Sequence, residues 1–320
     1  QWMRAERHLA QSRRRVGLAL DAIKTFYTGA SEDVLLKRPE LADLRTSLLK
    51  APLGFYQSLR EELEADDRPD REARAQLVDV LARVGELNAD VGREDDALRA
   101  YSEAAKTARR ILRDEPGDRP TRRALGDALV RAAEIDAQTS RLGRARDGLT
   151  DALGVFDALA RESPDDLEVQ EGRAACLHTL GNVECDEQHF EDSERRYLES
   201  VAILEDLVSR RPGHAKSLDD LGGAENDLAI MYAQWNRLDR AGRWFHEGLE
   251  TRRRLAREHG GSAGNLRKFA SSLNNYGGFL QNTDRLPDAL PYYEEAGAIQ
   301  ERLVRENPTV ALYQDDLAVT

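Results

Sequence analysis

The sequence predicts an all-α fold, a right-handed α-solenoid of antiparallel helix pairs with a 48-residue period. Prolines recur at this step, at 116, 164, 212 and 308, and Gly260 stands where one is missing. Both residue types end helices, so the series marks the boundaries of units. The chain has 320 residues, of which 33% are charged and 6% aromatic, and this is too polar for one large core. A repeat array avoids that difficulty, because each unit buries its apolar face only against its neighbours.

A column of residues with almost no side chain recurs at the same 48-residue step. Its members are Gly85, Ala133, Gly181, Ala229 and Gly277. Positions this small allow two helix backbones to approach closely. We therefore place the column in the first helix of each unit, where that helix contacts the second.

Three further columns describe the second helix of each unit. They are a small column (Ala97, Ala145, Ser193, Ala241, Ala289), a large one (Tyr101, Leu149, Tyr197, Phe245, Tyr293) and another small one (Ala104, Ala152, Ser200, Gly248, Ala296). Their spacings of four and three residues put all three columns on one helix face. The twelve residues that precede them are enough to cross a turn. Each unit is thus a helix, a short turn and an antiparallel helix, with the large side chain filling space between one hairpin and the next.

Small, small, aromatic, small and proline positions in this order resemble the tetratricopeptide repeat (TPR) pattern over residues 69–308. The resemblance implies five TPR-like repeats, at 69–116, 117–164, 165–212, 213–260 and 261–308. Each is 14 residues longer than the family's usual 34, so both helices are expected to be about two turns longer. Ser193, Ser200, Gly248 and Leu149 depart from the pattern, and Pro291 argues against a regular second helix in the last unit.

Both ends of the chain lie outside these five units. Residues 309–320 are expected to be the start of a truncated further helix, and the chain begins with Gln1. We therefore expect a piece of a longer protein. Residues 1–68 are expected to form an N-terminal helical stem or capping hairpin, with a basic amphipathic helix over 2–28 and a second helix over 39–66.

Two interpretations of this N-terminal part stay open. One is a degenerate hairpin that covers the open end of the solenoid, since terminal repeats must be atypical to stay soluble. The other is a stem next to a membrane. The residues from Ala19 to Leu49 resemble the segment that precedes TPR arrays in planctomycete-type bacterial serine/threonine protein kinases. That resemblance implies a kinase domain, often a membrane helix, then this stem and the repeats.

The resemblance leaves the side of the membrane open. The arginines of residues 2–28 would favour the cytoplasmic side of an upstream membrane helix under the positive-inside rule, whereas the usual layout of such kinases puts the repeats outside. Within the chain there is no run of 18 apolar residues and no signal-peptide pattern. We expect a soluble segment of a membrane-tethered protein.

Motifs for catalysis, metal binding and nucleic-acid binding are missing from the sequence. It contains no glycine-rich kinase loop, no H-R-D, no D-F-G, no H-E-x-x-H and no G-x-S-x-G. The net charge of −12 argues against a broad contact with nucleic acid. Cys176 and Cys185 are nine residues apart, which fits neither a zinc site nor a disulfide framework. The fragment is therefore expected to have no catalytic activity, metal or cofactor.

The concave face is the expected binding surface. Positions three before, two before and one after the first small column should point into it. The residues predicted to bind a peptide there are Asn182, Asn226, Asn274, Asn275, His178 and Arg131. An asparagine donates and accepts hydrogen bonds together, so a row of them can hold an extended peptide backbone. Alternatively, these asparagines bond neighbouring helices or water.

The expected ligand is a neutral or basic protein segment, because aspartates make one edge of the groove acidic. Trp235 and Trp244 are either an exposed aromatic anchor or packing between repeats. The predicted function is a non-catalytic protein-binding or peptide-binding scaffold, the regulatory or substrate-docking region of a serine/threonine protein kinase. The alternative is a stand-alone structural adaptor that associates with itself.

Overall fold

The computed structural model describes residues 54, 56–58, 60–61, 71–259, 262–308 and 310–319. The expectations for the basic helix at 2–28 and for the stem-like segment up to Leu49 lie outside these residues.

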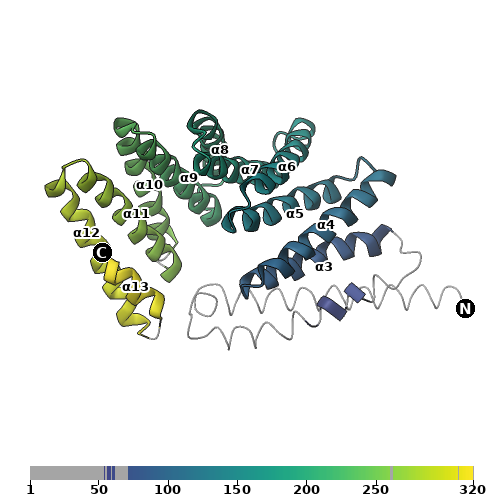
Figure 1. Cartoon of the computed structure of the whole chain (residues 1–320), viewed down its shortest axis with the longest axis horizontal. Helices are drawn as coiled ribbons and strands as arrows, with labels where there is room; N and C mark the ends of the chain where they lie inside the picture. The colour runs from purple at the N-terminus through teal and green to yellow at the C-terminus, as the bar shows by residue number, and fades with distance from the viewer. Residues whose placement is uncertain are drawn as a thin grey trace, which may run out of the picture.

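Paired antiparallel helices follow one another along the described part of the chain. The pairs are α3 (Arg71–Asp90) with α4 (Glu94–Asp114), α5 (Arg119–Gln138) with α6 (Leu142–Glu162), α7 (Leu167–Asp186) with α8 (Phe190–Arg210), α9 (Ala215–Gln234) with α10 (Leu238–Glu258), and α11 (Ala263–Asn282) with α12 (Leu286–Glu306); α13 (Ala311–Val319) follows them. Each first helix starts 48 residues after the previous one, and so does each second helix. Figure 1 shows the pairs stacked side by side into a curved array. The predicted all-α solenoid of helix pairs is confirmed. None of these described helices is long and apolar enough to cross a membrane.

Each pair turns through a residue with positive φ, again at a 48-residue step. These residues are Gly92, Ser140, Gln188, Asn236 and Asp284, with φ between 57° and 75°. The left-handed residue lets the next amide bond back to the end of the first helix, as when the Arg141 N–H donates to the Asp136 carbonyl at 2.7 Å. Residue type does not reveal this column, because only one of its members is a glycine.

The first small column lies against the large column within each pair. A Cβ added to Gly181 would lie 3.0 Å from the ring of Tyr197, and one added to Gly277 would lie 3.0 Å from Tyr293. At Gly85 the separation from Tyr101 would be 2.8 Å. The tyrosine rings therefore occupy the space that a side chain at the glycine would need.

The two serines that depart from the TPR pattern are fully buried and hydrogen-bonded. Ser193 donates to the Gly181 carbonyl at 2.8 Å, and Ser200 donates to the Ala174 carbonyl at 2.9 Å. Both bonds run from α8 to α7. A hydroxyl can replace the usual methyl here because a helix carbonyl of the paired helix accepts its proton.

Neighbouring pairs are joined by large side chains that reach past glycines. Phe156 of α6 is fully buried, and Cβ atoms added to Gly126 of α5 or Gly172 of α7 would clash with its ring, at 2.7 Å and 2.3 Å. The ring thus lies where α5, α6 and α7 meet. This contact helps to set how one unit stacks on the next.

The second helix of the last pair is continuous despite its proline. Helix α12 runs from Leu286 to Glu306 with Pro291 inside it, so the expected irregularity does not break the helix. Pro291 is exposed and lies in the second turn. It therefore costs one backbone hydrogen bond near the helix start rather than a break in the middle.

Candidate functional site

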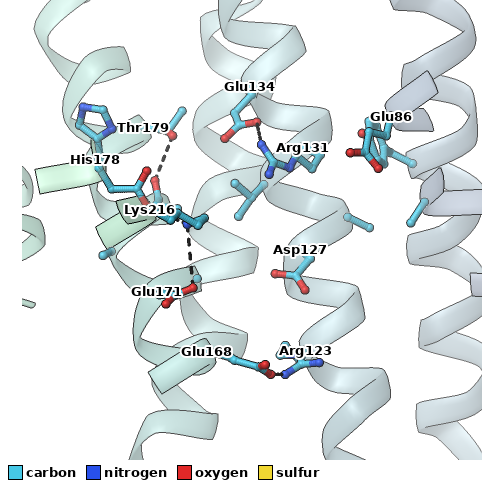
Figure 2. A pocket seen from close by; sticks show the side chains of 18 of the residues that line it. Glu86, Arg123, Asp127, Arg131, Glu134, Glu168, Glu171, His178, Thr179 and Lys216 are labelled. Carbon is cyan, nitrogen blue, oxygen red and sulfur yellow. Dashed lines mark hydrogen bonds and ion pairs between the residues drawn. The ribbon is translucent and has the colours of Figure 1, made fainter. Parts of the chain in front are cut away.

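A cavity of about 1080 Å³ opens on the inner side of the array. Most of its lining comes from the first helices of four successive pairs, α3, α5, α7 and α9. Figure 2 shows charged side chains from these helices facing one another across it. Because the period is 48 residues, the lining residues come from equivalent positions of different units. One such row is Asp79, Asp127, Ala175 and Gly223.

Two of the six predicted binding residues, Arg131 and His178, line this cavity. Arg131 donates to Glu134 at 3.0 Å, and Figure 2 shows both at its upper side. The Nε2 atom of His178 lies 2.9 Å from a carboxylate oxygen of Asp227, on the next pair.

The predicted asparagine row makes hydrogen bonds between helices. Asn182 accepts a hydrogen bond from the Tyr197 hydroxyl. Asn275 donates to the side-chain oxygen of Asn226 at 3.1 Å, and Asn226 donates to Asp227 at 3.3 Å. Neither these three asparagines nor Asn274 line the cavity. Three of the four thus have the contacts that the alternative interpretation described.

Every lysine or arginine that lines the cavity has a carboxylate partner. The pairs are Arg83–Glu86, Arg123–Glu168, Arg131–Glu134 at 3.0 Å, Lys216–Asp220 at 2.7 Å and Arg252–Asp219. Among the described residues, the cavity lining thus has no lysine or arginine without a carboxylate partner that would clamp a carboxylate or a phosphate.

Two lining carboxylates, Asp79 of α3 and Asp127 of α5, have no ion pair among the described residues. Desolvation by the surrounding walls raises the pKa of both groups above the ordinary value. The positive charge of Arg123 opposes this rise in both, so the two aspartates share an electrostatic neighbour. Figure 2 shows Asp127 near the centre of the site. When ionised, these two carboxylates give this half of the cavity a negative charge that no ion pair among the described residues offsets.

Arg252 is a cavity residue that was not predicted from the sequence. It stands 96 residues after Phe156 and is buried like it, with 8% of its surface exposed. Its side chain runs past Gly222, where an added Cβ would lie 3.1 Å from it, and reaches Asp219. The adjacent glycines Gly222 and Gly223 were the available signal, because they leave room for a long side chain.

The two tryptophans singled out from the sequence pack between units. Trp235 stacks on Phe190 of the preceding pair at 5.9 Å between ring centroids, and the Arg237 guanidinium lies 4.9 Å from its ring centroid. Trp244, like Trp235, is partly buried against the apolar core that helices α7 to α10 share. Both side chains thus have the contacts that inter-repeat packing predicts.

The family model of the tetratricopeptide repeat matches residues 269–308, within the last helix pair. The comparison with curated proteins found no match. Among solved structures, BtubC (BKLC) from P. vanneervenii is similar, with 18% identity, a TM-score of 0.62, and coverage of 80% of this chain and 92% of that one.

Two further structures show the same arrangement of helices. A putative kinesin light chain from Podosopora anserina with nearly identical TPR-like repeats has 14% identity and a TM-score of 0.52, covering 72% of this chain and 97% of that one. RapI in its apo form has 12% identity and a TM-score of 0.51, covering 83% and 96%. At such identities the likeness shows the fold, which is a TPR-like solenoid.

Proposed function

We propose that this TPR-like array is a non-catalytic scaffold that binds an extended segment of another protein in its inner cavity. Solenoids use their concave surfaces in this way, because successive units present equivalent side chains along one face. The observation that carries the proposal is the cavity of about 1080 Å³ with polar groups from four helix pairs. A volume of this size lies at or above the upper end of ordinary small-ligand pockets, and it suits several residues of a peptide.

The polar groups of the cavity suit a ligand that has both donors and acceptors. Thr179, His178 and the carboxylates of Glu86 and Glu134 lie on its lining. Peptide backbones present one N–H and one carbonyl per residue, so such groups can bind them whatever the side chains are. The predicted asparagines could bind the ligand only if it displaced the hydrogen bonds that they make between helices.

Binding to short unstructured peptides tests the proposal. Fluorescein-labelled peptides of varied sequence would be titrated with the full chain, and anisotropy would report binding. The variant Ala175→Trp places a large ring in the cavity lining of α7 and should weaken binding by about tenfold or more. The matched control is Gly154→Trp, on the exposed side of α6, where an added Cβ meets nothing within 4 Å.

Unchanged binding in Ala175→Trp would place the ligand elsewhere and contradict the proposal. Loss of binding in both variants would also contradict the proposal, because Gly154 does not line the cavity. Circular dichroism of both variants would establish that each remains folded.

We propose further that the scaffold is the regulatory or substrate-docking region of a serine/threonine protein kinase. The support is the resemblance of residues 19–49 to the stem of planctomycete-type kinases. The full coding sequence tests this, since a kinase domain must be encoded upstream of Gln1. A coding sequence without one would remove this part of the proposal and leave the scaffold function untouched.

A further inference from the structure

We infer that the occupant of the cavity carries a lysine or arginine side chain, which docks on the α3 and α5 half between Asp79 and Asp127. The inference rests on the proposed scaffold function and specifies the chemistry of its partner. It rests on the distribution of charge over the cavity lining.

The cavity's own cations are already neutralised. Each of the five arginine and lysine side chains on the lining has a carboxylate partner within the protein. An acidic ligand would have to displace one of these partners. A basic ligand needs no such exchange at Asp79 and Asp127, whose carboxylates have no ion pair among the described residues.

Asp79 and Asp127 occupy one row of the repeat. They stand at equivalent positions of the first and second pairs, 48 residues apart, and both line the cavity. The third and fourth pairs have Ala175 and Gly223 in this row. In this row, negative charge therefore lies only on the α3 and α5 half of the cavity. We expect the basic side chain to dock there.

In the opposite half, the carboxylates of the lining are ion-paired within the protein. Asp219 of α9 pairs with the buried Arg252 and, at 2.5 Å, with Lys268. Asp220 pairs with Lys216 at 2.7 Å, and Glu171 pairs with Arg211. A basic side chain that docked in this half would have to displace one of these cations.

A set of three probes tests the inference. They are fluorescein-labelled peptides of equal length with alternating glycine and lysine, glycine and glutamine, or glycine and glutamate. We expect the lysine probe to bind the full chain at least about tenfold more tightly than the glutamine probe, and the glutamate probe to bind most weakly.

The variant Asp127→Asn should weaken the lysine probe by about tenfold and leave the glutamine probe unaffected. It should fold, because Asp127 is exposed, has no ion pair among the described residues, and is replaced by an amide of similar shape. The matched control is Asp147→Asn on α6, an exposed aspartate off the cavity, which makes the same change in net charge. Asp79→Asn should behave like Asp127→Asn.

The outcomes separate this inference from the proposed function. Equal binding of the lysine and glutamine probes, with both lost in Ala175→Trp, would refute the basic side chain and keep the scaffold. Equal weakening by Asp127→Asn and Asp147→Asn would also refute it, because attraction to the chain's overall negative charge would then explain the binding. Failure of all three probes to bind would refute the inference and the scaffold function together.

Discussion

At the scale of the residue, a tyrosine in the large column occurs together with a glycine in the first small column. Tyr101, Tyr197 and Tyr293 each lie on a glycine of the first helix of their pair. The two pairs with another residue in the large column, Leu149 and Phe245, have an alanine at the glycine position instead. In the three tyrosine pairs the ring lies against the backbone of the first helix, so a methyl group at the glycine would have to displace it. A tyrosine in the large column therefore favours a glycine in the small one.

Replacing Gly181 by leucine should lower the free energy of unfolding by about 1–3 kcal/mol, because the added side chain must displace the Tyr197 ring. Urea denaturation followed by circular dichroism would measure it. Gly154→Leu, at an exposed site with open space, serves as the control and should be neutral or stabilising. An unaltered midpoint for Gly181→Leu would mean that the two columns do not pack as described.

Glu225 is a second residue with a measurable consequence. It is 4% exposed, and its Oε2 atom has no hydrogen-bond partner among the described residues. Burial raises its pKa to about 7, a hydrogen bond from Thr251 opposes the rise, and the charges of Glu247 and Glu205 add to it. The nearby charge of Arg252 lowers it. The folded chain therefore holds a proton here that the unfolded chain releases at lower pH.

The stability of the protein should consequently fall as the pH rises from about 4.5, the ordinary pKa, to about 7. Above that range the ionised carboxylate costs roughly 3 kcal/mol. Glu225→Gln should remove this loss, raising the unfolding free energy at pH 8 and leaving it nearly unchanged at pH 4. Urea denaturation of the wild-type protein and the variant at pH 4 and pH 8 would measure this difference. A gain in unfolding free energy of equal size at both pH values would contradict the raised pKa of Glu225.

At the scale of the element, the helices follow the sequence pattern closely. The repeating prolines and small residues predict paired helices at a 48-residue step, and each described helix starts at that step. The pattern works because helix packing in a repeat depends on residues within one unit and its neighbour. The conformation of the turns is harder to predict from the sequence. Four of the five left-handed residues are not glycine, namely Ser140, Gln188, Asn236 and Asp284. Nothing in their residue type alone predicts that conformation for serine or glutamine.

Pro291→Ala gives a prediction for helix α12. The alanine restores an amide that can donate to the Pro287 carbonyl, so the unfolding free energy should rise by about 1 kcal/mol. Pro287→Ala is the control, because a proline in the first turn leaves no bond unmade and its removal should gain nothing. Urea denaturation of both variants measures the difference. Equal effects would show that the proline inside the helix costs no hydrogen bond.

At the scale of the whole molecule, the site was only partly predictable. The position of Arg131 and His178 on the cavity follows from helix periodicity within a unit. The bond between Asn226 and Asn275 joins side chains 49 residues apart, so it depends on how one pair stacks on the next. Arg252 lies on α10, the second helix of its pair, and whether it reaches the cavity also depends on how the pairs stack. Spacing within a unit does not contain this information, because stacking is set by side chains such as Phe156 that cross between units.

The inner cavity is the surface that we propose binds an extended basic segment. Photo-crosslinking tests this proposal most directly: the glycine-lysine probe would carry a benzophenone, and mass spectrometry would locate the adducts on the full chain. We expect adducts on the cavity-lining first helices, mainly α3 and α5, that disappear in Ala175→Trp and persist in Gly154→Trp. Adducts spread over α4, α6 and α8, or unchanged in Ala175→Trp, would contradict the proposal.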